Sequence, residues 1–510
     1  MSRVVVIGAG LAGLATACHL SGSGHDVTLI EAEDAPGGRA GQIVRDGFRF
    51  DTGPTVLTMR SLLEDVVGAA GGDLDALLPM QRLDPAYRAT YSDGSEILVR
   101  HGHEAMRAEI AEKSGAADAA AFDRFVPWLK RLYEVEMPHF IDANFDTPLD
   151  LVRNPRAAAS LVTMGGFGRL GPAVKRRFID DRLRRLFTFQ AMYAGLPPSS
   201  ALAIYAVITY MDCIEGVYFP DGGMAAVPHA LAKAATDNGV DLRLGQKVTR
   251  VLRRPDGPVA GVEIDAGPIK GSEKLMADAV VCTLDLPVAY RHLLPDLAPP
   301  RVVRTGDYSP SAVVWHVGAR GDLPAGARHH NIHFADAWDS SFDALIKQGR
   351  MMPDPSRLVT IPSLTDPTAA PDGAHTLYVL EPAPNLDGVV DWRTQRGRTR
   401  EELLAFLERE GYPTDIVTEE LVDPLDWQAQ GMERGTPFAL AHTFAQTGPF
   451  RPSNVEKRLP GFFFAGSGTV PGVGVPMVLV SGRLAAERVT SYLPTVPRRQ
   501  PRITTTEGAA

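Results

Sequence analysis

The sequence predicts an α/β protein, α+β overall, with a Rossmann-like nucleotide-binding domain, a domain with a mixed sheet and a helical region. Three observations support this fold class. A glycine-rich strand–helix–strand pattern opens the chain, and helices and strands alternate again over residues 216–285. A second strand, glycine-rich loop and helix start lie near the C-terminus. Such alternation is typical of a parallel sheet covered by helices.

Length and composition narrow the possible functions. The 510 residues exceed what one hydrophobic core holds, so two or three domains are expected. Hydrophobic residues make up 45% and charged residues 22%, which is usual for a globular enzyme. The net charge of -9 argues against nucleic acid as a partner. The three cysteines, Cys18, Cys213 and Cys282, have no metal-like spacing and indicate a reducing compartment.

The first thirty-one residues carry the pattern of a dinucleotide-binding unit. A strand is expected over Val4–Ile7, a helix over Leu11–Leu20 and a second strand over Asp26–Ile30, followed by Glu31. The early arginine and apolar run also resemble a secretory signal. The register of strand, glycine turn, helix, strand and acidic residue favours nucleotide binding.

Each residue type in this unit suits a nucleotide. Gly8 allows the turn, Gly10 lets a pyrophosphate approach the backbone, and Gly13 brings helix and strand close together. The helix start, which includes Leu14, offers free N–H groups and a positive dipole to phosphate. Glu31 can accept hydrogen bonds from ribose hydroxyls.

Two further stretches follow the second strand. In "APGGRAG", Gly38 allows close backbone approach and Arg39 can neutralise a phosphate, although a surface arginine in a loop is the alternative. In "GFRFDTGPTVL", Gly53, Pro54 and Thr55 would form a rigid turn that could lie against a flat ring system.

Residues 461–482, "GFFFAGSGTVPGVGVPMVLVSG", contain no charge and are long enough to span a bilayer. Their glycines and prolines would break a transmembrane helix repeatedly, so we expect a strand, a loop and a helix from Met477 instead. A long flavin dinucleotide could lie with one end on the first unit and its ring at this second helix start. The cofactor-site residues predicted here are Gly466, Gly468, Gly474, Val475 and Met477.

The middle of the chain is expected to return to the nucleotide-binding layer. Its predicted elements are a helix over Met224–Asn238 and strands over Val240–Leu244, Lys247–Arg253, Val259–Ile264 and Ala277–Asp285. The backbone at Val248 could contact an adenine.

These motifs together resemble the bacterial and fungal phytoene desaturases, within the amine-oxidase-like flavoproteins. The likeness runs from Val4 to about Val489. Its more specific stretches include "LFTFQAMYAGLPPSSALAIYAVITYMDCIEGVYFPDGG", "HHNIHF", "TDPTAAPDGAHTLYVLEPAPNL", "ERGTPFALAHTFAQTGPFRPSN" and "GSGTVPGVGVPMVLVSGRLA". The chain departs from the family at Val470, usually a histidine, and at Val473, usually a small residue.

The resemblance implies FAD as a non-covalent cofactor and dehydrogenation of a long polyene hydrocarbon, such as phytoene to lycopene or an intermediate. Oxygen and a quinone are the possible electron acceptors. Asp150 and Arg153 match a polar pair sometimes proposed as acid/base groups in the family. An ordinary ion pair on a helix surface is the alternative for them.

A hydrocarbon of about forty carbons must come from a bilayer, because its burial is worth on the order of 30 kcal/mol against water. Residues 153–178 carry six basic residues, no acidic residue and several apolar ones, which suits a peripheral contact with the inner face of the cell membrane from the cytoplasm. A solvated basic face is the alternative. The aromatic and apolar run Leu186–Tyr210 could line a hydrocarbon tunnel or be plain helical core.

Other functions remain open at this point. His329, His330 and His333 lack a nearby carboxylate ligand, and no metal site is expected. A flavin amine oxidase and a non-catalytic prenyl-binding protein are the alternatives to a desaturase.

The chain is expected to divide into four parts. They are a discontinuous FAD-binding domain (1–75, 215–300 and 445–492), a substrate domain (76–110 and 301–444), a helical membrane-contact region (111–214) and a disordered tail (493–510).

Overall fold

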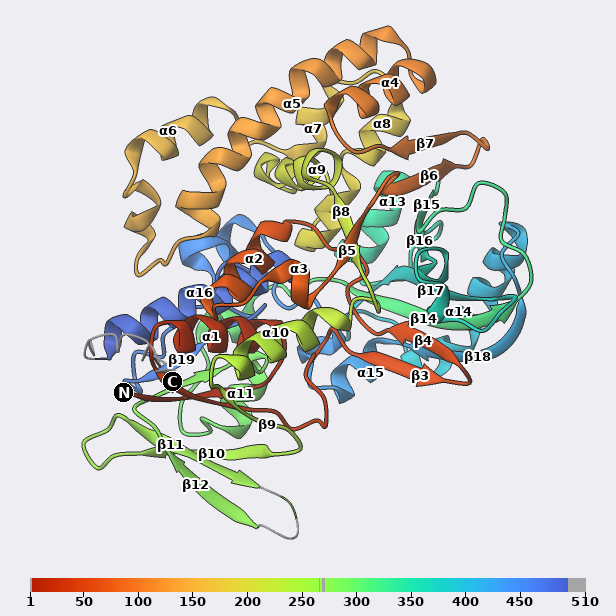
Figure 1. Cartoon of the computed structure of the whole chain (residues 1–510). Coiled ribbons are helices and arrows are strands. Elements are labelled where there is room, and N and C mark those ends of the chain that lie inside the picture. The colour runs from red at the N-terminus through yellow and green to blue at the C-terminus, as the bar shows by residue number, and fades with distance from the viewer. Residues whose placement is uncertain (1, 266, 268–270, 494–510) are drawn as a thin grey trace, which may run out of the picture.

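The computed structural model describes residues 2–265, 267 and 271–493 (Figure 1). Of the tail expected to be disordered, only Leu493 falls within these residues. The described residues build two large sheets and a helical region that lies to one side of them (Figure 1). The predicted α/β class with a nucleotide-binding sheet and a mixed second sheet is confirmed.

A five-stranded parallel sheet forms the base of the nucleotide-binding part. Its order is β19 (Phe462–Phe464), β13 (Ala279–Cys282), β1 (Arg3–Ile7), β2 (Asp26–Ile30) and β9 (Asp241–Arg243). The central strands β13 and β1 are apolar and rich in valine, because both faces of the sheet are covered there. The neighbours β19, β13 and β1 bring the C-terminal, middle and N-terminal parts of the chain into one layer.

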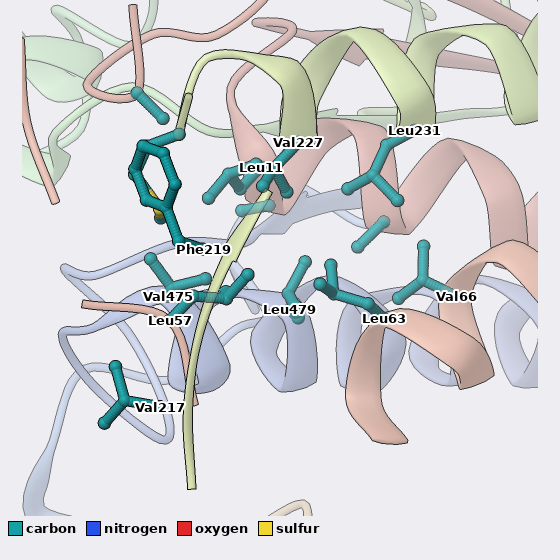
Figure 2. Close-up of a cluster of buried hydrophobic side chains, with 14 of the residues drawn as sticks. Leu11, Leu57, Leu63, Val66, Val217, Phe219, Val227, Leu231, Val475 and Leu479 are labelled. Atoms are coloured by element: carbon teal, nitrogen blue, oxygen red, sulfur yellow. The ribbon is translucent and has the colours of Figure 1, made fainter. Parts of the chain in front are cut away.

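Helices cover the face of this sheet that carries Val4, Val6 and Leu29. Figure 2 shows how side chains of four helices meet there: Leu11 of α1, Leu63 of α2, Val227 of α10 and Leu479 of α16. The four helices are α1 (Leu11–Gly22), α2 (Arg60–Ala69), α10 (Ala226–Asp237) and α16 (Val475–Tyr492).

The opposite face, with Val5, Ile7 and Ile30, packs against a small antiparallel sheet and helix α11 (Leu286–His292). This sheet contains β10 (Lys247–Arg253), β11 (Val259–Asp265) and β12 (Ser272–Met276). The strands predicted over residues 247–253 and 259–264 therefore form, but they cover the parallel sheet instead of joining it.

The second large sheet is mixed and has seven strands. Its order is β18 (Asp415–Val422), β14 (Ser311–Arg320), β17 (Ala374–Ala383), β16 (Arg357–Thr360), β15 (His330–Phe334), β6 (Tyr87–Tyr91) and β7 (Glu96–Val99). Only the β15–β6 pair is parallel among them. Helix α14 (Trp392–Arg409) packs Leu403 and Phe406 on the face that carries Trp315, and the other face is turned to a cavity described below.

The helical region contains α4 (His103–Lys113), α5 (Ala116–Glu136), α6 (Pro155–Thr163), α7 (Leu170–Lys175), α8 (Asp181–Leu186) and α9 (Val207–Tyr210). An aromatic cluster holds it together. Phe125 of α5 contacts Phe178 with ring centroids 5.3 Å apart, and Phe178 contacts Phe187 at 5.0 Å. Aromatic pairs of this geometry stabilise beyond their buried area.

Shorter elements connect these parts. They are α3 (Leu74–Leu77), α12 (Arg301–Thr305), α13 (Trp338–Phe342), α15 (Pro424–Ala429), the hairpin β3 (Gln42–Arg45) and β4 (Phe48–Asp51), and the pair β5 (Met80–Leu83) and β8 (Val217–Pro220). Single turns are η1 (Met137–Ile141), η2 (Pro148–Val152), η3 (Phe189–Ala194), η4 (Ala203–Ala206), η5 (Met211–Glu215), η6 (Asp343–Lys347), η7 (Pro362–Leu364), η8 (Pro367–Ala369), η9 (Glu433–Gly435), η10 (Phe444–Gln446) and η11 (Gly448–Phe450).

The predicted boundaries agree with the structure for some elements and are a few residues off for others. Strand β2 begins and ends where predicted, whereas the helix expected from Met477 already begins at Val475, directly after Gly474. Within residues 2–265, 267 and 271–493, no helix has the length and apolar character needed to cross a bilayer.

Gly482 of α16 allows this helix to lie directly on α1. A Cβ atom at position 482 would lie 2.5 Å from the carbonyl oxygen of Ala12 and 2.8 Å from the Cβ of Ala15. We expect Gly482→Ala to lower the free energy of unfolding by roughly 1–3 kcal/mol, because the two helix backbones must separate. Urea unfolding followed by circular dichroism measures the change.

The control is Gly397→Ala in α14, where a Cβ atom would meet nothing within 4 Å. Alanine is favoured over glycine by about 1 kcal/mol in an open helical position, so this variant should be as stable as the parent or more so. Equal stability of the two variants would contradict the proposed close contact.

Candidate functional site

A large cavity, with a volume of about 1150 Å³, runs between the parallel sheet, the mixed sheet and the helical region. Pockets for small molecules usually measure roughly 300–1,000 Å³, so this one has room for a long ligand. Most of the predicted cofactor residues line it: Gly8, Gly10, Glu31, Gly38, Arg39, Gly53, Pro54, Thr55, Val248, Gly466, Gly474, Val475 and Met477. Gly13, Leu14 and Gly468 do not line it.

Gly13 and Gly468 do not line the cavity but allow close packing behind its wall. A Cβ atom at Gly13 would lie 1.9 Å from the carbonyl oxygen of Gly8, so only glycine lets α1 start this close to β1. At Gly468 a Cβ atom would lie 3.1 Å from Leu286. Leu14 is fully buried in the core between the sheet and its helices.

The starts of α1 and α16 are both open toward a ligand. Gly10 and Gly474 are their N-cap residues, and neither helix has a side chain that caps its first N–H groups. A helix start of this kind binds an anionic or polar group through its N–H groups and dipole.

Glu31 lies at the end of β2 and is 9% exposed. Its carboxylate accepts hydrogen bonds from the backbone N–H groups of Ala9, at 2.7 Å, and Glu33, at 3.0 Å. These bonds fix the orientation of the side chain at the cavity wall. Each carboxylate oxygen retains a further lone pair, which can accept a ribose hydroxyl.

Arg39 joins the N-terminal unit to the C-terminal loop. Its guanidinium donates to the Ser467 hydroxyl, at 2.5 Å, and lies 3.3 Å from the buried carboxylate of Asp285. A Cβ atom at Gly53 would lie 1.8 Å from the carbonyl oxygen of Arg39, so the Gly53–Thr55 turn packs on the same segment.

A buried arginine, Arg451, supports the C-terminal loop from behind. It donates to the carbonyl oxygens of Thr469, at 3.0 Å, and Ser467, at 2.7 Å, and to two further carbonyls. Burial lowers the pKa of its guanidinium to about 10, which still leaves it charged at neutral pH. Sequence reasoning missed Arg451, since a lone arginine in "FRPSN" carries no motif.

The rest of the cavity is apolar and aromatic. These aromatic residues come from the mixed sheet, the helical region, α13 and residues 427–450. They are Tyr87, Phe140, Phe145, Phe167, Phe189, Tyr205, Phe334, Trp338, Tyr378, Trp427, Phe438, Phe444 and Phe450. The run Leu186–Tyr210 contributes to both predicted roles, because Phe189 and Ile208 line the cavity whereas Leu186 and Phe187 are buried in the core. Val470 and Val473 also line the cavity.

Asp150 and Arg153 lie away from this wall. Asp150 accepts from the backbone N–H groups of Asp146, at 2.7 Å, and Thr147, at 3.0 Å, and so closes the turn η2. Arg153 points to solvent, and its guanidinium lies 2.9 Å from the carboxylate of Asp150. The catalytic assignment of this pair stays a prediction, and the surface ion pair is the arrangement that the side chains form.

Two buried carboxylates that the sequence did not single out line the cavity, Glu136 and Asp212. Glu136 Oε1 and Asp212 Oδ2 have no hydrogen-bond partner among the described residues. Burial raises the pKa of Asp212 to about 7 and raises that of Glu136 well above its ordinary value. A sequence signal existed for Asp212, because it interrupts the otherwise apolar run "AVITYMDCI".

The three histidines of "HHNIHF" point to separate partners. His329 and His330 lie within hydrogen-bonding distance of Thr365 and Thr360, and His333 of Thr90 and Tyr412. In the part of the chain that the structure describes, no three His, Cys, Asp or Glu side chains are arranged to hold a metal ion.

Comparison with known proteins identifies the family. Residues 11–490 match the family described as flavin containing amine oxidoreductase. A phytoene dehydrogenase of Streptomyces griseus is 50% identical over 98% of both chains. A zeta-carotene-forming phytoene desaturase of Myxococcus xanthus is 34% identical, covering 96% of this chain and 94% of the relative.

The chain belongs to the flavin containing amine oxidoreductases, in the group of the phytoene desaturases. The resemblance drawn from its motifs is thereby confirmed. Among solved structures, an oxidoreductase from Methanosarcina mazei aligns with a TM-score of 0.61 at 18% identity, covering 95% of this chain and 100% of that one. Wild-type putrescine oxidase bound to putrescine aligns with a TM-score of 0.58 at 17% identity, covering 96% and 99%. These two likenesses concern the fold alone.

The cofactor of this flavin containing amine oxidoreductase is FAD. The cavity fits such a group, because it combines two uncapped helix starts, glycines that side chains could not replace and a buried carboxylate at the end of β2. Glu31 would hold a ribose, the start of α1 the pyrophosphate, and the start of α16 the ring end.

Glu31→Gln tests the ribose contact. The amide retains one acceptor oxygen but places an NH₂ group against a backbone N–H, so the side chain would lose its fixed orientation. We expect FAD affinity to fall about 10- to 100-fold, since hydrogen bonds to a charged acceptor are worth about 1.5–3 kcal/mol. Titration of the apoprotein with FAD, followed by flavin fluorescence, measures it.

The control is Glu64→Gln on the exposed outer side of α2, which should leave FAD affinity unchanged. Equal FAD affinities of the Glu31 variant and the parent protein would show that Glu31 does not contact the ribose.

Proposed function

We propose that this chain is an FAD-dependent desaturase that removes hydrogen from a long polyene hydrocarbon, phytoene or a close relative of it, in carotenoid biosynthesis. The observation that carries the proposal is the shape and lining of the cavity. One continuous space of about 1150 Å³ joins the residues suited to FAD with an aromatic and apolar wall suited to a hydrocarbon. The 50% identical phytoene dehydrogenase supports the same substrate class. The expected product is lycopene or an intermediate.

The protein residues would contribute binding, orientation and exclusion of water. FAD, when bound, supplies the hydride-accepting oxidant for a carbon–carbon desaturation. The apolar wall holds the chain of the substrate and removes water from the reacting carbons. Aromatic side chains such as Phe334 and Tyr378 line the cavity, and a ring face turned to the substrate would favour the partial positive charge that develops on an allylic carbon.

We further propose the division into parts expected from the sequence. The parallel sheet takes its strands from residues 3–30, 241–282 and 462–464, in support of a discontinuous FAD-binding domain. The mixed sheet takes its strands from residues 87–99 and 311–422, in support of a substrate domain. Residues 111–214 supply the helical part of the cavity wall.

We also propose that the helical region contacts the inner face of the cell membrane from the cytoplasm. Leu149 is 77% exposed and Val162 64% exposed, which is unusual for large apolar side chains. Phe167 and Phe444 are exposed, lie 6.2 Å apart and line the cavity. A membrane contact at this place would let a hydrocarbon pass from the bilayer into the cavity.

The basic residues of this surface are Arg153, Arg156, Arg169, Lys175 and Arg176, all exposed. Arg177 does not belong with them. It is half-buried and stacks on Trp128, with 4.2 Å between the guanidinium carbon and the ring centroid. Burial lowers the pKa of Arg177, and its role is to hold α7 against α5.

The reaction itself is tested with phytoene in liposomes and FAD-loaded protein. Without an electron acceptor, the flavin absorbance should bleach once as substrate is oxidised and then stay constant. Addition of oxygen or a quinone should restore the absorbance and produce yellow to red products, which chromatography resolves.

Protein prepared without FAD is the matched control and should leave phytoene intact. Bleaching by an amine, with phytoene recovered unchanged, would favour an amine oxidase. A protein that binds phytoene but bleaches with neither compound would favour a non-catalytic binding protein.

For the membrane contact, we expect the triple variant Arg156→Gln, Lys175→Gln and Arg176→Gln to lose binding to anionic liposomes. Each cation near such a surface is worth about 1 kcal/mol, so partition should fall by about two orders of magnitude at low salt. Co-sedimentation with liposomes measures it. The control removes three exposed arginines of α14, Arg393, Arg398 and Arg409, which Figure 1 places across the molecule from α6. Equal sedimentation of the two variants would place the membrane contact elsewhere.

A further inference from the structure

We infer that Asp212 is the proton acceptor of the desaturation, a role that rests on the proposed function. Removal of two hydrogens from neighbouring carbons requires one group that takes a hydride and one that takes a proton. FAD fills the first role. The structure offers a small number of protein groups for the second, and three carboxylates merit comparison: Asp150, Glu136 and Asp212.

Asp212 has the geometry of a functional group. It lies on η5, is 3% exposed and lines the apolar part of the cavity. Its Oδ2 atom is buried and has no hydrogen-bond partner among the described residues. A buried carboxylate oxygen without a partner is costly to the fold, and such costs are typical of active sites.

The position of Asp212 along the cavity suits the reaction. Its neighbour Met211 belongs to one apolar cluster with Met59, Val207 and Met477. Met477 lies in the first turn of α16, where the ring end of FAD is expected. The proton must leave from a carbon next to the one that loses the hydride, so the acceptor has to lie in the same cavity as the ring, and Asp212 lines that cavity.

The surroundings of Asp212 make it a base at neutral pH. Burial raises its pKa to about 7, and a hydrogen bond from Gln190 of η3 partly offsets this rise. The other titratable groups around it are Tyr87 of β6, Tyr193 of η3 and Cys213 of η5, whose pKa values its charge helps to raise. A base with a pKa near the working pH combines ionisation with proton affinity.

The other two carboxylates fit this role less well. Burial raises the pKa of Glu136 well above its ordinary value, which favours the neutral carboxyl group, and a neutral carboxyl group is a poor proton acceptor. Backbone hydrogen bonds from Asp146 and Thr147 lower the pKa of Asp150, and its side chain does not line the cavity.

The desaturation breaks two C–H bonds on neighbouring carbons. The C–H bond of one allylic carbon breaks, and its hydrogen leaves with both electrons as a hydride to the flavin. The C–H bond of the neighbouring carbon breaks, its electron pair forms the new C=C bond, and its proton forms an O–H bond on Asp212. The substrate loses two hydrogens and two electrons, the flavin gains the hydride, and Asp212 returns the proton to water before the next step.

Asp212→Asn is the decisive variant, measured by anaerobic bleaching of the flavin with phytoene liposomes between pH 5.5 and 8.5. In the parent protein the bleaching rate should rise with pH through a midpoint near 7, because only the ionised carboxylate accepts the proton. In Asp212→Asn the rate should fall about 10²- to 10⁴-fold and the pH dependence should disappear. Asp212→Glu should recover part of the rate and the pH dependence.

The matched control is Glu215→Gln on the same turn. Glu215 is half-buried, has a pKa raised by burial and does not line the cavity. This variant should keep both the rate and the pH dependence. FAD titration of every variant should give the affinity of the parent protein, which separates a lost base from a lost cofactor.

Stability gives a readout that a structural role would move in the opposite direction. The pKa of Asp212 is higher in the folded than in the unfolded protein. The free energy of unfolding therefore falls as the pH rises from about 4 to about 7, and the whole loss is present above pH 7. Asp212→Asn should therefore raise the urea midpoint relative to the parent more at pH 8 than at pH 4.

Two outcomes would overturn the inference. If phytoene bleaches the parent flavin and Asp212→Asn retains the rate and its pH dependence, the proton acceptor is another group while the proposed desaturation stands. If phytoene does not bleach the parent flavin at any pH, the proposed function fails and the role of Asp212 fails with it.

Discussion

The close approach of α1 and α16 is the constraint on which the site depends. The hydroxyl of Thr16 lies 3.2 Å from the carbonyl oxygen of Gly482, across 466 positions of sequence. Because both helices start at the same cavity, their contact fixes the distance between the two places where a long dinucleotide would be held. The Arg39–Ser467 and Arg39–Asp285 contacts then join the loops on either side. Loss of the contact between α1 and α16 would change the positions of the groups that hold both ends of the cofactor.

Much of the fold and the glycine-rich part of the site could be predicted, since their signals are local. A glycine that follows a β-branched strand and precedes a helix has few alternative structures, and Gly8, Gly10 and Gly474 lie where this pattern placed them. The separate sheet of β10–β12 was not predicted. The sequence predicts β10 and β11 as strands, but only tertiary contacts decide which sheet a strand joins.

The polar groups within the apolar cavity could not be found by pattern. Asp150 and Arg153 were singled out because they match a family motif, whereas the cavity wall carries Asp212 and Glu136. The apolar run around Asp212 makes that residue stand out, and residues 130–140 give no such signal for Glu136. Neither stretch shows that the carboxylate points into a cavity, because burial there depends on how α5, η5 and the mixed sheet meet. Arg451 belongs to the same class, since its carbonyl partners come together only in the folded loop.

The pairing of β5 with β8 has a consequence for how such proteins can diverge. Residues 84–216 leave the nucleotide-binding part at Leu83 and return to it at Val217, and these two residues are partners in one antiparallel ladder. The chain therefore leaves and re-enters this part of the molecule at neighbouring positions, although β6 within the segment also pairs with β15 of the mixed sheet. A segment with adjacent ends can lengthen, shorten or be exchanged at a small cost in chain entropy and without a change in the sheet that carries the glycines. The length of hydrocarbon that such a scaffold accepts can thus evolve separately from its redox chemistry.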